Sequence, residues 1–87
     1  MKTNEELVDE MQVMFDTYRE VSEIVEMQTG KPMNLDLLTV SDGILNSLRI
    51  IDNVEMTLKL HNELHKSLEI ILMTIEYHLP SYDKDRD

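Results

Sequence analysis

The stretch "IIDNVE", residues 50 to 55, decides between two folds, because it lies between two apolar stripes that are out of phase. At about 100° per residue, the apolar direction of a helix shifts by roughly 80° between Ile51 and Val54. A turn at Asp52 accounts for this shift and predicts two separate helices. An uninterrupted helix is the alternative, because neither glycine nor proline stands at position 52 or 53.

The segment before this stretch is predicted to be a short helix that begins near Asn34 or Thr39, since either side chain can cap its first turn. Gly43 is unfavourable within a helix, so it indicates either a close approach of another helix or the proximity of the helix start. The apolar stripe of this segment consists of Leu37, Val40, Ile44, Leu48 and Ile51.

The segment after the stretch is predicted to be a long helix that ends before Pro80, which cannot continue it. We expect residues 1 to 80 to form one helical domain, and the polar residues 81 to 87, "SYDKDRD", to be a disordered tail. The apolar stripe of this helix steps by four and three residues through Val54, Leu58, His61, His65, Leu68, Leu72, Ile75 and Leu79.

A first long helix, from about Asn4 to Gln28, is bounded by a Thr3–Glu6 capping box and by Gly30 at its end. Its two faces differ in character, which makes the helix amphipathic. The packing stripe is Leu7, Met11, Met14, Tyr18, Val21 and Val25, and the opposite, acidic face is Glu5, Asp9, Asp16, Glu20 and Glu23.

These segments predict an all-α protein, either a three-helix bundle of long, short and long helices or a helical hairpin in which the last two helices merge. A chain of 87 residues without cysteine has a small core and no disulfide to support it. We therefore expect a homodimer, in which a second chain supplies additional burial.

The charge excludes several classes of function. Eighteen acidic against eight basic residues give a net charge of −10, and no basic cluster exists to neutralise phosphates. We therefore expect no direct binding of nucleic acid and no membrane association. The sequence shows no membrane-spanning segment or signal peptide, and this favours a cytoplasmic location.

Residues 67 to 79 are apolar around most of the helix circumference. Either the other two helices both cover this segment, or it forms an interface with a second copy or another protein. For the interface, we predict Ile70, Met73 and Tyr77. Met11 and Met14 join them if they are exposed, since methionine suits adaptable binding surfaces as well as cores.

The stretch "HNELH", residues 61 to 65, places two histidines one turn apart. A zinc protease needs H-E-x-x-H, but Asn62 follows the first histidine here, and Glu63 lies about 200° around the helix from His61. His61 and His65 remain weak candidates for metal ligands. We favour polar residues that form hydrogen bonds across a helix interface, and we expect no cofactor.

Two acid pairs, Glu20 with Glu23 and Asp52 with Glu55, resemble those with which all-helical nucleotide pyrophosphatases of the MazG type hold magnesium. That family's pattern is E-x-x-E followed by E-x-x-D, whereas the second pair of this chain is reversed. The resemblance implies a metal-dependent enzyme, and we rank this third among three hypotheses.

The leading hypothesis is a non-enzymatic regulatory or adaptor protein that binds a protein partner through its helix faces. The second is an inhibitor whose acidic face, on the first helix, occupies a basic nucleic-acid-binding site of its target. The sequence alone does not identify the partner, so the structure must show which surface is available for binding.

Overall fold

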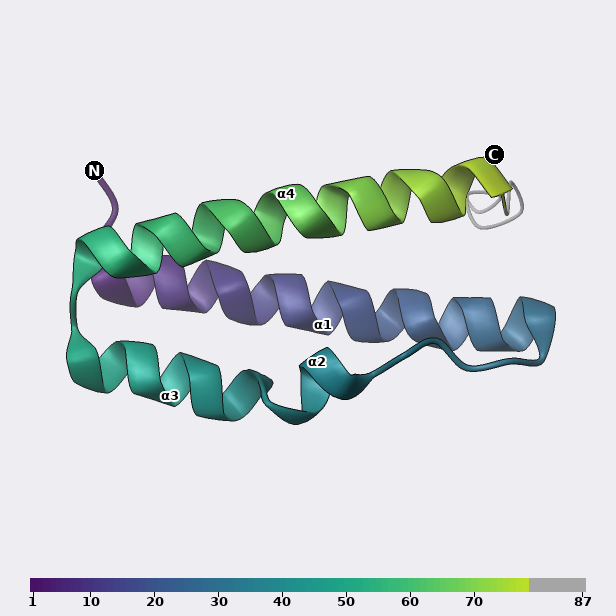
Figure 1. Ribbon diagram of the computed structural model, residues 1–87, viewed down its shortest axis with the longest axis horizontal. Coiled ribbons are helices and arrows are strands. Elements are labelled where there is room, and N and C mark those ends of the chain that lie inside the picture. The colour runs from purple at the N-terminus through teal and green to yellow at the C-terminus, as the bar shows by residue number, and fades with distance from the viewer. Residues whose placement is uncertain (79–87) are drawn as a thin grey trace.

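The computed structural model describes residues 1 to 78, and these form four helices: α1 (Asn4–Thr29), α2 (Asp36–Thr39), α3 (Ser41–Ile51) and α4 (Val54–His78). The all-helical prediction is confirmed, with α2 as a single additional turn. α1 and α4 run in the same direction and α3 runs back against them (Figure 1). Pro80 and the predicted tail, residues 81 to 87, lie outside the described residues.

The predicted boundaries of α1 are confirmed to within one residue. The Thr3 side chain accepts a hydrogen bond from the backbone N–H of Glu6, and the Glu6 side chain accepts one from the backbone N–H of Thr3, which completes the capping box. At the other end Gly30 has a φ of 75°, and its N–H donates to the carbonyl of Glu26. Glycine suits this left-handed position because it has no Cβ.

Within residues 50 to 55, α3 ends at Ile51 and α4 begins at Val54. The two residues between them form a turn, so the merged-helix alternative is wrong. Asp52 adopts the left-handed conformation, with φ 53° and ψ 45°, which aspartate tolerates better than most residues. The side chain of Asn53 then accepts a hydrogen bond from the N–H of Met56 at 3.0 Å, and so caps α4. The cap is therefore one residue later than the predicted Asp52–Glu55 pair.

The connection between α1 and α3 is held by side chains of α1, of the connecting segment and of α2. The side chain of Asn34 accepts a hydrogen bond from the N–H of Asp36 at 2.8 Å. The backbone carbonyl of Asn34 accepts one from the Tyr18 hydroxyl at 2.9 Å. Thr39 donates to the carbonyl of Asp36. Neither Asn34 nor Thr39 caps α3, whose N-cap residue is Val40 with no side-chain hydrogen bond.

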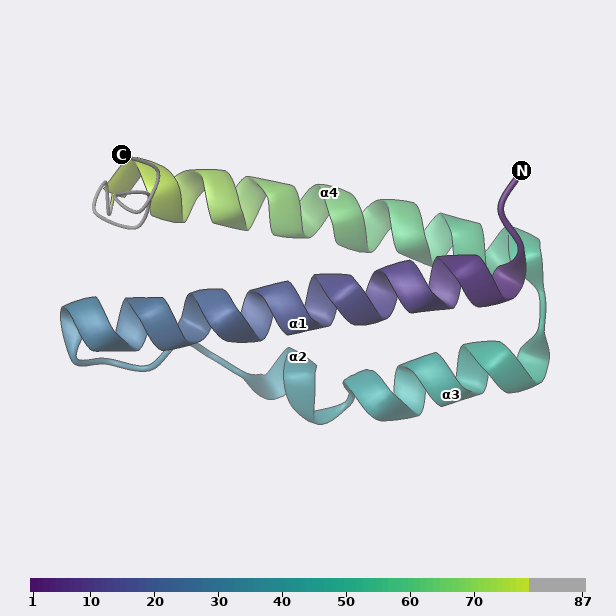
Figure 2. The same ribbon diagram turned by 180° about the vertical axis from the view of Figure 1, so that it is seen from behind.

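α1 lies between α3 and α4 in both views (Figures 1 and 2). It buries the predicted Leu7, Met11, Tyr18 and Val21, and in addition Val8 and Phe15 on the adjacent stripe. A single stripe was predicted, but a central helix with neighbours on two sides must bury a wider face. The buried hydrophobic side chains are Leu7, Val8, Met11, Phe15, Tyr18, Val21, Leu45, Leu48 and Leu68.

α3 and α4 both pack on α1 but barely touch each other, and the molecule measures 40 by 25 by 17 Å. Each of them therefore buries only the part of its apolar face that is turned towards α1. In α3, Leu45 is buried, whereas the predicted Val40 and Ile51 are 51% and 56% exposed. In α4, Thr57 is fully buried, whereas the predicted Leu58 is 41% exposed.

A buried polar link connects the three main helices at one end. The side-chain amide of Asn4, in α1, donates to the carbonyl of Leu48 in α3 at 3.2 Å. Its carbonyl oxygen accepts a hydrogen bond from the hydroxyl of Thr57 in α4 at 2.5 Å. Buried polar groups destabilise a fold unless they are paired, so this link specifies how the three helices meet.

Candidate functional site

An apolar groove runs between α3 and α4. Buried side chains of α1 and α3 form its floor. Two adjoining depressions, of about 550 and 220 Å³, make up this groove, and they share Ile44 and Leu60. The groove exists because the turn at Asp52 separates α3 from α4, while both helices pack on α1. Its lining residues are Met11, Phe15, Leu37, Thr39, Val40, Gly43, Ile44, Ser47, Leu48, Ile51, Met56, Leu60, Glu63, Leu64 and Ser67.

The side chains of this groove are apolar or small, and several of them are accessible. Val40, Ile51 and Leu60 are 51%, 56% and 43% exposed, and within residues 1 to 78 Glu63 is the one charged residue that lines the groove. A Cβ added at Gly43 would meet no atom within 4 Å. The groove therefore has open space at Gly43 and an unsatisfied apolar surface on both walls.

The apolar surface continues along the second half of α4. A further depression involves Ile70, Ile71, Thr74, Ile75 and His78 of α4, together with Val25 and Met33. The three predicted interface residues are all accessible, since Ile70, Met73 and Tyr77 are 60%, 63% and 80% exposed. α3 lies beside only the first half of α4 (Figure 1), so the alternative that both other helices cover this segment is wrong.

Met11 and Met14 of α1, which were considered for the interface, take different places, neither of them on this surface. Met11 is 2% exposed and belongs to the core, so it does not meet the condition of exposure on which its place in the predicted interface depended. Met14 is partly buried and lines a separate depression between α1 and α4, which His65 and Leu72 also line. A heptad stripe does not reveal which of its members the neighbouring helix covers, so the exposure of Met11 and Met14 could not be predicted from the stripe.

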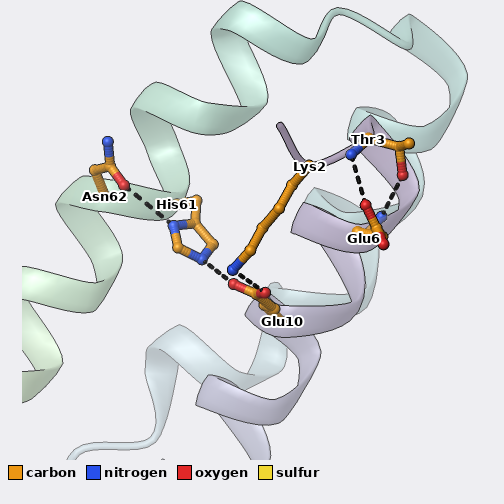
Figure 3. A network of polar contacts seen from close by, with 6 residues as sticks. All are labelled: Lys2, Thr3, Glu6, Glu10, His61 and Asn62. Carbon is orange, nitrogen blue, oxygen red and sulfur yellow. Dashed lines mark hydrogen bonds and ion pairs between the residues drawn. The ribbon is translucent and has the colours of Figure 1, made fainter.

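The two histidines of "HNELH" differ in their surroundings. His61 Nε2 lies 2.7 Å from Glu10 Oε1 of α1, as expected of a polar residue at a helix interface (Figure 3). His65 is exposed, and its ring stacks on that of His61 with 6.3 Å between the ring centroids. Within residues 1 to 78, no group of three His, Cys, Asp or Glu side chains is arranged to hold a metal ion.

Glu10 is the centre of a small charged network. Its carboxylate pairs with the Lys2 ammonium on one side and with His61 on the other (Figure 3). The hydrogen bond from Lys2 and then that from His61 hold the pKa of Glu10 below its ordinary value of 4.5. The network ties the start of α1 to α4, and no sequence pattern indicated Glu10, because it lies outside both predicted faces of α1.

The acidic face of α1 is partly neutralised by α3. Arg49 Nε lies 3.2 Å from Glu5 Oε2, and its terminal nitrogen lies 3.8 Å from Asp9 Oδ1. Further along, Arg19 pairs with Asp16 at 3.4 Å. The other two predicted members of the acidic face, Glu20 and Glu23, are exposed.

The two acid pairs that resemble a magnesium site are not brought together. The pair Asp52 and Glu55 flanks the start of α4, close to where Asn4 contacts Thr57. The pair Glu20 and Glu23 begins sixteen residues further along α1 than Asn4, or about 24 Å at 1.5 Å per residue. A magnesium site of the expected kind needs both pairs around one ion, and this separation prevents it.

In comparisons with protein-family models, curated proteins and solved structures, this chain matches none. Within residues 1 to 78, no helix combines the length and the apolar character that crossing a membrane requires. The site must therefore be interpreted from its own geometry. On that basis the groove between α3 and α4, with its continuation to Ile70, is the surface most suited to binding.

Proposed function

We propose that this chain is a non-enzymatic regulatory or adaptor protein that binds a protein partner in the apolar groove between α3 and α4. The exposed residues Ile70, Met73 and Tyr77 extend this binding surface along α4. The observation that supports the proposal most is the accessibility of Val40, Ile51 and Leu60 in one continuous groove.

The shape of the groove suits a helix. Together with the apolar surface that continues it, the groove follows α4 from Met56 to His78, which is about 33 Å at 1.5 Å per residue, and this length matches a helix of about 20 residues. An amphipathic helix that lies in such a groove buries its apolar face and leaves its polar face in water. Contiguous exposed apolar surfaces of this kind are unusual on chains that act without a partner.

The second hypothesis, an acidic inhibitor of a nucleic-acid-binding protein, has weaker support. Its surface is the acidic face of α1, and Arg49 already pairs with two members of that face, Glu5 and Asp9. The exposed Glu20 and Glu23 carry most of the remaining charge. The third hypothesis, a metal-dependent enzyme, lacks the arrangement of carboxylates on which it was based.

A photo-crosslinking experiment in the native host tests the proposal. A benzoylphenylalanine at Leu60 places the probe in the groove, and the same probe at Ile50 is the control. Ile50 is 83% exposed, but it lies about 100° around α3 from Ile51 and so points away from the groove. We expect a protein adduct from position 60 and none from position 50.

Two results would count against the proposal. If positions 60 and 50 give the same adducts, or if neither gives any, the groove is not a protein-binding site. If a probe at Glu20 forms adducts that disappear in high salt while position 60 forms none, the acidic inhibitor is favoured, because salt screens contacts between exposed charges.

A further inference from the structure

We propose that the occupant of the groove is a second copy of this chain, with α4 of each copy lying in the groove of the other. The inference rests on the proposed function, because it concerns the same surface and names the partner. A dimer of this kind is isologous: each copy contributes the same surface, which must be complementary to itself. Charge, shape and coverage each support this arrangement.

The distribution of charge favours a neutral occupant over a basic one. Glu63 is the one charged lining residue of the groove within residues 1 to 78, so a basic helix would find a single carboxylate there. The acidic face of α1 is turned away, because Asp9 and Glu20 lie about 160° to 180° around α1 from Met11 in the groove floor. Two copies of net charge −10 can therefore meet at this surface with their acidic faces on the outside.

The walls of the groove admit a closely packed helix. Gly43 and Ser47 lie one turn apart on α3, and Ser67 lies on the α4 wall. Small side chains reduce the distance at which two helix axes can pack. Apart from its chain neighbours and the backbone of its own helix, no atom of residues 1 to 78 lies within 4 Å of a Cβ added at Gly43, so no contact with another part of the same copy requires a glycine at this position.

A symmetric dimer covers both exposed features with one contact. A foreign helix in the groove would leave the outer surface of α4 in water, including Met73 and Tyr77, which are 63% and 80% exposed and are not among the residues that line the groove or its continuation. When α4 itself is the inserted helix, its outer surface enters the partner's groove and is covered there. The surface comprises about twenty residues of each copy, close to the roughly 20 to 30 residues per side of a standard interface.

Sedimentation equilibrium on the full 87-residue chain tests the inference. The key variants are Ile51→Lys, which places a charge in the groove, and Ile50→Lys, which places the same charge on the adjacent residue outside it. We expect the wild type and Ile50→Lys to be dimers. Ile51→Lys should raise the dissociation constant at least about tenfold, since a buried unpaired charge opposes association.

A third variant, Gly43→Leu, keeps the test independent of charge. The Cβ of the added side chain meets no other part of the monomer, and circular dichroism should show unchanged helix content, but the leucine blocks a closely packed second helix. We expect it to be monomeric under conditions where the wild type is dimeric. Dimers of wild type, Ile51→Lys and Gly43→Leu with equal dissociation constants would overturn the inference.

The inference and the proposed function fail in distinguishable ways. A wild type that stays monomeric at about 100 µM, where a dimer with a micromolar dissociation constant is almost fully formed, overturns the inference. If the Leu60 probe then still forms an adduct with a different protein, the groove remains a protein-binding site. If the probe forms no adduct at all, both are wrong.

Discussion

Thr57→Val tests how the three main helices are held together. The Thr57 side chain is fully buried, and its hydroxyl donates a hydrogen bond to the side-chain carbonyl oxygen, Oδ1, of Asn4, which is itself buried. Valine has nearly the same shape and the same branching at Cβ, so the change removes the hydrogen bond and leaves helix propensity almost unaltered. The carbonyl oxygen of Asn4 is then buried without this donor.

The expected loss follows from this unpaired group. Leaving a buried acceptor unsatisfied costs about 1 to 3 kcal/mol, and the extra apolar group of valine offsets up to about 0.8 kcal/mol of it. We therefore expect the free energy of unfolding to fall by about 1 to 2 kcal/mol. In a domain of this size the melting temperature falls by about 4 to 8 °C per kcal/mol, hence by roughly 4 to 16 °C in total.

Thermal unfolding followed by circular dichroism, at one protein concentration, measures this loss. Thr74→Val is the matched control, because Thr74 is exposed on the same helix and its hydroxyl donates to the carbonyl of Ile70 within that helix. The control should stay within about 0.5 kcal/mol of the wild type. Equal melting temperatures for the two variants would refute the role assigned to the Asn4–Thr57 hydrogen bond.

Three further predictions concern the turn, the charged network and the groove. Asp52→Gly should stabilise the chain in urea unfolding by about 0.5 to 1 kcal/mol, because glycine adopts the left-handed backbone conformation of this position without strain. The adjacent Asn53→Ala should destabilise the chain by about 1 kcal/mol, because it removes the side chain that caps α4. The pKa of Glu10 in the folded chain lies below 4.5, so the ionised Glu10 carboxylate stabilises the fold above pH 4.5, and this stabilisation is lost as the pH falls through the folded pKa. The difference in melting temperature between the wild type and Glu10→Gln should therefore become smaller from about pH 6 to about pH 3. Gly43→Ala should stabilise the dilute monomer by up to about 1 kcal/mol in urea unfolding and yet weaken self-association in sedimentation, because alanine favours the helix but narrows the groove.

Local signals in the sequence predicted both ends of α1 well. The capping box at Thr3 and the glycine at position 30 act through neighbouring backbone groups, so their effect is readable without knowledge of the fold. The phase shift across residues 50 to 55 also predicted the turn, although its cap is Asn53 and not Asp52. These features depend on interactions between residues only a few positions apart.

The faces of the helices were predicted less well, because burial depends on the arrangement of neighbours. The predicted apolar stripe of α3 omitted Leu45, which is buried, and included Ile51, which is exposed, since α1 covers only one side of that helix. Likewise the contact of Glu10 with His61 joins residues 51 positions apart. No periodicity within one helix specifies which residue of another helix it will meet.

Three places where the sequence is locally unfavourable lie together. Gly43 lies in a helix without a neighbour that requires it, and Ile51 and Leu60 are apolar side chains left half exposed. All three line the same groove. By contrast, every buried side-chain polar atom within residues 1 to 78, including those of Asn4 and Thr57, has a hydrogen-bond partner. An uncovered apolar groove, in a chain whose buried polar side chains are paired, supports the proposal that this groove contacts a second surface, since departures from local stability concentrate where a protein functions.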